Sequence, residues 1–162
     1  MLKTKGNKTE ILFILDNLRY EDEQELINSS GKDWKKKTLL NLEDKTCLVL
    51  YGRDNSGNQV PIAMGGFCDI ENDEYPIACV WLLSTSYVYK NKMLLMKELR
   101  RQIMQGSEKY RIMYNFIYKS NFEAKKWLRK LGFKFDNPKP SGLETGKDFE
   151  FFYKVCPSKK LR

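Results

Sequence analysis

The stretch that decides the fold is "NFEAKKWLRKLGF", residues 121–133. Asn121 stands where a helix N-cap is expected, and Gly132 follows the last helical position. The residues "FKF" at 133–135 then begin a strand. The stretch therefore predicts a helix over 121–130 that runs directly into a strand. The side chains expected to face inward have the spacing of an amphipathic helix: Phe122, Ala124, and Trp127 or Leu128.

Outward from this stretch, the chain reads as helices first, then a run of strands, then alternating helices and strands. We expect helices over 9–18, from Asp22 to 31, over 33–42, over 90–105 and over 121–130. We expect strands over 46–53, 60–70, 77–84, 111–118, 133–135 and 148–155.

Local signals set several of these boundaries. Asp22 can cap the second helix, because Glu25 three residues later completes a capping-box pattern. Gly106 is expected to stop the helix over 90–105. The last strand alternates one row of side chains against another. The first row is Phe149, Phe151, Tyr153 and Val155, and the second is Asp148, Glu150, Phe152 and Lys154.

This order predicts an α+β fold with a mixed, partly antiparallel sheet flanked by helices. A helix separates the strands over 77–84 and 111–118, so we expect them to be adjacent and parallel. A chain of 162 residues is predicted to form a single domain over 1–162. Its basic ends, about 1–8 and 156–162, are expected to be frayed.

The composition restricts the chemistry. No histidine is present, which excludes histidine-based triads, and no pair of the four cysteines has C-x-x-C spacing. We expect reduced thiols and no metal site. No apolar run approaches a membrane span, so we expect an intracellular protein with no membrane partner. The net charge of +8 leaves contact with nucleic acid or acidic proteins open.

The order of elements and the stretch over 121–133 resemble the GNAT superfamily of N-acetyltransferases. The late motif of that superfamily has Asn, then Ala three residues on, two apolar residues six and seven on, and a final Gly-Phe. The matching residues are Asn121, Ala124, Trp127, Leu128, Gly132 and Phe133. The resemblance implies the acetyltransferase fold, with acetyl-CoA as the cofactor of active members.

Four stretches carry a narrower resemblance: "NLRYEDEQELINSSG" (17–31), "VPIAMGG" (60–66), "VWLLSTSYV" (80–88) and "WLRKLGF" (127–133). They look like the acetyltransferase-like internal virion and morphogenesis proteins of short-tailed phages. This resemblance implies a phage protein that takes part in virion assembly. It would contact other phage or host proteins, in the host cytoplasm or in the virion.

The expected cofactor site departs from the superfamily pattern. Active members hold the coenzyme A pyrophosphate with a glycine-rich segment that opens the helix after the central strand. The matching region here, 84–92, reads "STSYVYKNK" and has no glycine. Thr85 and Ser86 can instead cap the helix. If acetyl-CoA binds, the residues implied to contact it are Leu82, Leu83, Thr85, Ser86, Lys90 and Asn121.

The catalytic groups are also in doubt. Many members use a tyrosine seven residues after the motif asparagine as the acid, and that position is Leu128 here. Tyr114 and Tyr118 are the candidate substitutes, although strand aromatics commonly serve packing. The strand over 77–84 has no acid to act as the base. Two functions stay open: a virion-assembly protein with a degraded acetyl-CoA site, or an active N-acetyltransferase on a protein or small-molecule amine.

Overall fold

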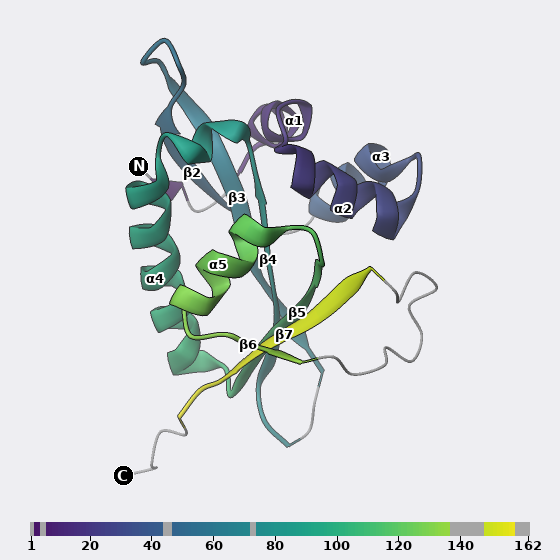
Figure 1. Ribbon diagram of the computed structural model, residues 1–162, viewed down its shortest axis with the longest axis vertical. Coiled ribbons are helices and arrows are strands. Elements are labelled where there is room, and N and C mark those ends of the chain that lie inside the picture. The colour runs from purple at the N-terminus through teal and green to yellow at the C-terminus, as the bar shows by residue number, and fades with distance from the viewer. Residues whose placement is uncertain (1, 4–5, 44–46, 72–73, 137–147, 158–162) are drawn as a thin grey trace. The chain divides into compact units, whose positions relative to one another are not determined.

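The computed structural model (Figure 1) describes residues 2–3, 6–43, 47–71, 74–136 and 148–157. Its elements follow the predicted order, with a short N-terminal strand and a 3₁₀-helix in addition. The helices are α1 (Lys8–Asp16), α2 (Tyr20–Ser30), α3 (Trp34–Glu43), η1 (Ser86–Tyr89, 3₁₀), α4 (Lys92–Lys109) and α5 (Phe122–Lys130). The strands are β1 (Leu2–Lys3), β2 (Leu48–Arg53), β3 (Gln59–Ile70), β4 (Ile77–Ser84), β5 (Ile112–Tyr118), β6 (Lys134–Asp136) and β7 (Phe149–Val155).

The described strands form one mixed sheet in the order β1-β2-β3-β4-β5-β7-β6. Strands β1 and β3 pair antiparallel with β2, and β5 and β6 pair antiparallel with β7. Strand β4 pairs parallel with β5, from Ile77 opposite Ile112 to Cys79 opposite Tyr114. The parallel pair follows from α4, which returns the chain along the sheet. The predicted α+β class, with a mixed sheet flanked by helices, is confirmed.

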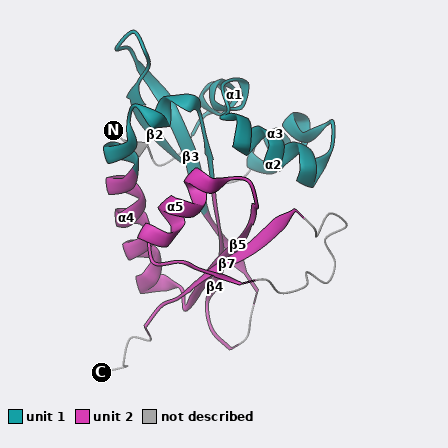
Figure 2. Cartoon of the chain, viewed as in Figure 1, with its two compact units in different colours: residues 1–66, 82–95 teal, residues 67–81, 96–162 magenta. Residues whose placement is uncertain are grey.

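Contacts divide the chain into two compact units, which Figure 2 colours separately. Unit 1 comprises residues 1–66 and 82–95, and unit 2 comprises residues 67–81 and 96–162. Strands β3 and β4 and helix α4 each contribute residues to both units. The assignment of 1–162 to one domain stays a prediction.

The first described residues form a strand pair and a helix cap. Asn7 Oδ1 accepts the N–H of Glu10 at 2.9 Å, and Glu10 Oε2 accepts the N–H of Asn7 at 2.8 Å. This capping box starts α1, and β1 pairs with β2 just before it. The fraying expected for residues 1–8 stays a prediction, although the described residues among them form a strand pair and a helix cap. Residues 137–147, and residues 158–162 of the basic C-terminal end, lie outside the described residues.

Unit 2 has its core on the face of the sheet that α4 and α5 cover. Met113 and Ile117 of β5 and Phe152 of β7 are buried there. Leu99 of α4 and Leu128 of α5 pack against the same cluster. Burial of these apolar groups is the main stabilising contribution to this unit.

Strand β7 corrects one prediction. Phe152, placed in the row of mostly polar residues, is 5% exposed, whereas Val155 is 55% exposed. The ring of Phe152 meets Phe133 edge-on, with centroids 5.4 Å apart. Strand β7 lies between β5 and β6, so both of its faces are available for packing. A strict inside–outside alternation therefore fails here.

Gly106 does not stop α4, which continues to Lys109. A Cβ atom at Gly106 would lie 2.7 Å from Cε1 of Phe67. The glycine is therefore required by close packing against an aromatic ring and does not end the helix. The helix also begins at Lys92 and not at Lys90, because the 3₁₀-helix η1 precedes it.

The second helix begins earlier than predicted. Helix α2 starts at Tyr20, and its N-cap, Arg19, makes no side-chain capping bond. Asp22 lies inside the first turn, so the predicted capping role for Asp22 is wrong. Leu18, predicted to end the first helix, instead forms an isolated antiparallel bridge with Thr85. These shifts free the Asp22 carboxylate for contacts outside its own helix.

Candidate functional site

The buried end of β4 is tied to the turn between α1 and α2, within unit 1. Asp22 Oδ2 accepts the N–H of Ser84 at 2.9 Å and the Ser84 hydroxyl at 2.8 Å. The carbonyl of Ser84 accepts the N–H of Arg19 at 2.9 Å. Ser84 is fully buried and Asp22 is 4% exposed. Both backbone groups of Ser84 are therefore satisfied by residues that precede it by more than sixty positions.

Asp22 is also half of a buried ion pair. Arg19 Nε donates to Asp22 Oδ2 at 3.1 Å, and Arg19 Nη2 pairs with Asp22 Oδ1. Burial alone lowers the pKa of Arg19, but the Asp22 carboxylate, with a smaller contribution from Tyr89, outweighs it and raises the pKa above its ordinary value. Arg19 and Asp22 therefore place a charge-compensated, buried pair at the end of β4.

Thr85 and Ser86, the two hydroxyl residues implied to contact acetyl-CoA, differ in burial. Thr85 is fully buried, and its N–H and hydroxyl both donate to the carbonyl of Ile62, at 2.9 and 3.2 Å. Thr85 precedes η1 but makes no side-chain cap, so its predicted capping role is wrong. Ser86 is exposed. Leu82 and Leu83 are half-buried residues of β4.

The start of α4 is anchored to β2. Asn91 Nδ2 donates to the carbonyls of Arg53 and Tyr87, each at 2.9 Å, and Asn91 Oδ1 accepts the N–H of Arg53 at 3.2 Å. Lys90 is exposed, and its Nζ donates to the carbonyl of Asp54 at 3.1 Å. The Nζ of Lys92 lies 5.6 Å from the ring centroid of Tyr89. Two lysines, Lys90 and Lys92, thus lie at this helix start, whereas the guanidinium of Arg53 donates to the carbonyl of Gly57.

The candidate catalytic tyrosines belong to unit 2, in an aromatic row. Tyr114 and Tyr118 of β5 lie opposite Tyr153 and Phe149 of β7. Tyr114 has a ring contact with Phe151 at 5.7 Å, and Tyr118 with Phe149 at 5.7 Å. Burial, and then the nearby Cys79, raise the pKa of Tyr114. These contacts are those of cross-strand packing.

The side chain of Asn121 caps α5, and two later residues of that helix pack inside the protein. Asn121 is 1% exposed, and its Oδ1 accepts the N–H of Ala124 at 3.4 Å as the N-cap of α5. Trp127 is 6% exposed, and Leu128 packs against the core of unit 2. The side-chain oxygen implied to contact a cofactor is therefore used by the helix that carries it.

Asn115 is a site residue that the sequence did not indicate. Its Nδ2 donates to the carbonyl of Val80 at 2.8 Å, just past the last recorded β4–β5 pair at Cys79. Arg19, Asp22 and Ser84 were missed too. The only sequence signal for them was a pair of acidic residues two and three positions after an arginine in "RYED", and helix starts commonly contain acidic residues.

Other site classes find little support among the described residues. No group of three or more His, Cys, Asp or Glu in that part of the chain could hold a metal ion. The four cysteines form no disulfide, and Cys47 and Cys156 are buried. No helix of the described residues has both the length and the apolar character needed to cross a membrane.

No protein-family model and no curated protein sequence matches this chain. Several solved structures do. An aminoglycoside N(6')-acetyltransferase from Legionella pneumophila is 20% identical with a TM-score of 0.67, over 96% of this chain and 91% of that one. A GNAT-family acetyltransferase from Streptococcus agalactiae is 12% identical with a TM-score of 0.64, over 98% and 96%.

A third similar structure is the spermidine N-acetyltransferase from Vibrio cholerae, solved with CoA and spermine. It is 12% identical with a TM-score of 0.58, over 96% of this chain and 94% of that one. At these identities the likeness is one of fold. The chain therefore has the GNAT acetyltransferase fold.

Proposed function

We propose that this GNAT-fold chain has a degraded acetyl-CoA site and acts through contacts with other proteins. The observation that carries this proposal is the state of residues 84–92, where an active relative would hold the cofactor's pyrophosphate. Five of the nine backbone N–H groups of this segment already donate within the chain. They are those of Ser84, Thr85, Val88, Lys90 and Asn91.

An occupied N–H group binds phosphate only if its existing hydrogen bond is broken. The N–H of Ser84 donates to a buried carboxylate, and the N–H of Thr85 donates to the carbonyl of Ile62 on β3. Buried hydrogen bonds, above all those to charged groups, are costly to lose.

The backbone shape of the segment points the same way. A phosphate-binding nest needs residues that alternate between right-handed and left-handed conformations. Residues 84–92 contain no glycine, and no non-glycine residue in the described chain has a positive φ. The segment instead forms the 3₁₀-helix η1, with Val88 buried. This backbone geometry therefore supports the proposal that the segment does not bind a pyrophosphate.

The biological setting of this proposal comes from the sequence resemblance alone. We infer a role in virion assembly, with phage or host proteins as partners, in the host cytoplasm or the virion. Mass spectrometry of particles from the phage that encodes the chain tests this role. Absence of the protein from both mature particles and assembly intermediates would refute it.

Calorimetric titration with acetyl-CoA tests the cofactor part of the proposal. We expect no saturable heat, in parallel with a GNAT-fold enzyme that uses acetyl-CoA as the positive control. A dissociation constant near 1 μM, about −8 kcal/mol, would overturn it. A thermal-shift series gives an independent readout, because a ligand bound to the native state raises its stability.

One observation favours the second candidate, an active N-acetyltransferase on a protein or small-molecule amine. The N-terminus of α4 attracts anions, and Lys90 and Lys92 lie at it. Under this reading Lys90→Gln with Lys92→Gln should weaken acetyl-CoA binding by about tenfold, because two cations would be removed from the phosphates. Binding that is unaffected by both substitutions would place the cofactor elsewhere.

A further inference from the structure

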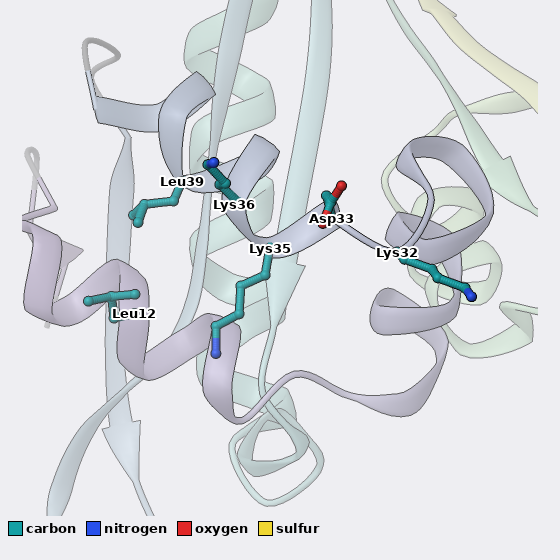
Figure 3. A pocket seen from close by; sticks show the side chains of 6 residues that line it. All are labelled: Leu12, Lys32, Asp33, Lys35, Lys36 and Leu39. Carbon is teal, nitrogen blue, oxygen red and sulfur yellow. The ribbon is translucent and has the colours of Figure 1, made fainter.

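Unit 1 has a shallow hollow between α1 and α3 (Figure 3). None of the residues implied to contact acetyl-CoA lines it. Its volume is about 420 Å³. One lining residue comes from α1 and the others come from α3 and the turn before it. They are Leu12, Lys32, Asp33, Lys35, Lys36 and Leu39.

The hollow has an apolar part and a basic part. Leu12 and Leu39 are half-buried, so each still offers apolar surface to a ligand. Three of the six lining residues are lysines, and one is an aspartate. Figure 3 shows Lys35 extending toward α1, where its Nζ pairs with Asp16.

The other two lysines of the hollow have no recorded carboxylate partner of the kind that Asp16 provides for Lys35. Lys32 and Lys36 are exposed, and neither has a recorded ion pair with any residue of the described ranges. Their charges face solvent, and Figure 3 shows the Lys32 side chain extending away from the two leucines, at the edge of the hollow. This combination suits a ligand that carries both carboxylates and an apolar side chain.

We propose that this hollow docks an acidic segment of a partner protein. An apolar side chain of that segment rests on Leu12 and Leu39, and its carboxylates approach Lys32 and Lys36. A single strand of nucleic acid fits less well, because it needs aromatic side chains for stacking and none of the six lining residues is aromatic. The contact area is small, so the interaction is weak and reversible.

A labelled peptide in which glutamates flank a pair of leucines is the probe, with fluorescence anisotropy as the readout. Lys32→Gln with Lys36→Gln should raise the dissociation constant by about fivefold, as expected for two exposed charges. Lys97→Gln with Lys130→Gln is the matched control, because both lysines are exposed and lie outside the hollow. The control should change the constant less than about twofold.

A second pair of variants tests the contact with the apolar part of the hollow. Leu39→Gln should weaken peptide binding, whereas Leu40→Gln should not, because Leu40 is the next residue, is 57% exposed and does not line the hollow. Circular dichroism of each variant confirms that it is folded. Equal effects of the two substitutions would overturn the proposed contact with Leu39.

Three further outcomes would overturn the proposal. They are no peptide binding at all, equal binding of a peptide with glutamine in place of glutamate, and displacement of the peptide by oligothymidylate at equal or lower concentration. The inference rests on the proposed role in protein contacts but is tested without acetyl-CoA. Failure here therefore leaves the cofactor result unchanged, and the reverse also holds.

Discussion

Asp22 Oδ2 accepts hydrogen bonds from both the backbone N–H and the hydroxyl of Ser84, at 2.9 and 2.8 Å, although the residues are 62 positions apart. The same carboxylate pairs with Arg19. One side chain therefore joins the start of α2, the preceding turn and the end of β4. Under the proposed function, this junction occupies the region where an active relative would hold its cofactor.

The substitution Asp22→Asn should lower the free energy of unfolding by roughly 3–5 kcal/mol, because it removes the carboxylate that pairs with the buried Arg19. Urea unfolding followed by circular dichroism measures the loss. Adding Arg19→Met should recover part of it, since the double variant buries no charge. Glu108→Gln, at an exposed position of α4, is the control and should be nearly neutral. A loss no larger than that of Glu108→Gln would contradict this account.

Gly52→Ala should destabilise the protein by roughly 1–3 kcal/mol through overpacking. The new Cβ would lie 2.7 Å from Asn91 Oδ1 and from Ile62 Cδ1, and so would displace the amide that holds Arg53. A double-mutant cycle with Asn91→Ala tests the mechanism, because the cost of Gly52→Ala should be smaller once Asn91 is removed. Strict additivity would show that the clash lies elsewhere.

Trp127→Ala should cost roughly 3–5 kcal/mol, because the ring is 6% exposed. Phe122→Ala in the same helix is a matched control, since that ring is 66% exposed. The control should cost far less in the same denaturation experiment. Similar losses for the two variants would mean that Trp127 is not a core residue.

Leu128→Tyr places a phenol at the position of the superfamily's usual acid. Leu128 packs against the core of unit 2, and residues 84–92 contain no glycine. We expect no acetyl transfer from acetyl-CoA to a panel of amines by either protein, because an acid needs a positioned thioester. Activity in the wild type would refute the degraded-site proposal. Activity in the variant alone would show that the cofactor site survives.

Tyr51 should make stability depend on alkaline pH. Burial, and then its hydrogen bond to Glu10, raise the pKa of Tyr51 from 10.0 to about 12. The folded pKa exceeds the unfolded one, so the stabilising effect is complete below pH 10 and is lost as the pH rises through about 12. The stability difference between wild type and Tyr51→Phe should therefore shrink across this range. A stability difference that stays constant across this range would contradict the account.

The type and order of the main helices and strands follow from the sequence alone. The apolar spacing in 121–130 and the cap at Asn121 are local signals, and α5 begins and ends within a residue of the predicted bounds. The same holds for β4, whose bounds are the predicted 77–84. A long periodic segment and its cap depend on neighbours within one or two turns, which the sequence displays directly.

The roles of individual residues at some helix ends were decided only by the tertiary structure. Gly106 has the local signature of a helix stop, but the ring of Phe67 requires a glycine inside the helix. Asp22 has the signature of a cap, but Ser84 and Arg19 take its carboxylate. Such outcomes depend on which groups meet across dozens of residues, and each is settled by the need to pair a buried polar group or avoid a clash. Local sequence patterns do not show which distant residues meet, so the contacts of Arg19 and Asp22 with Ser84 could be identified only from the folded chain.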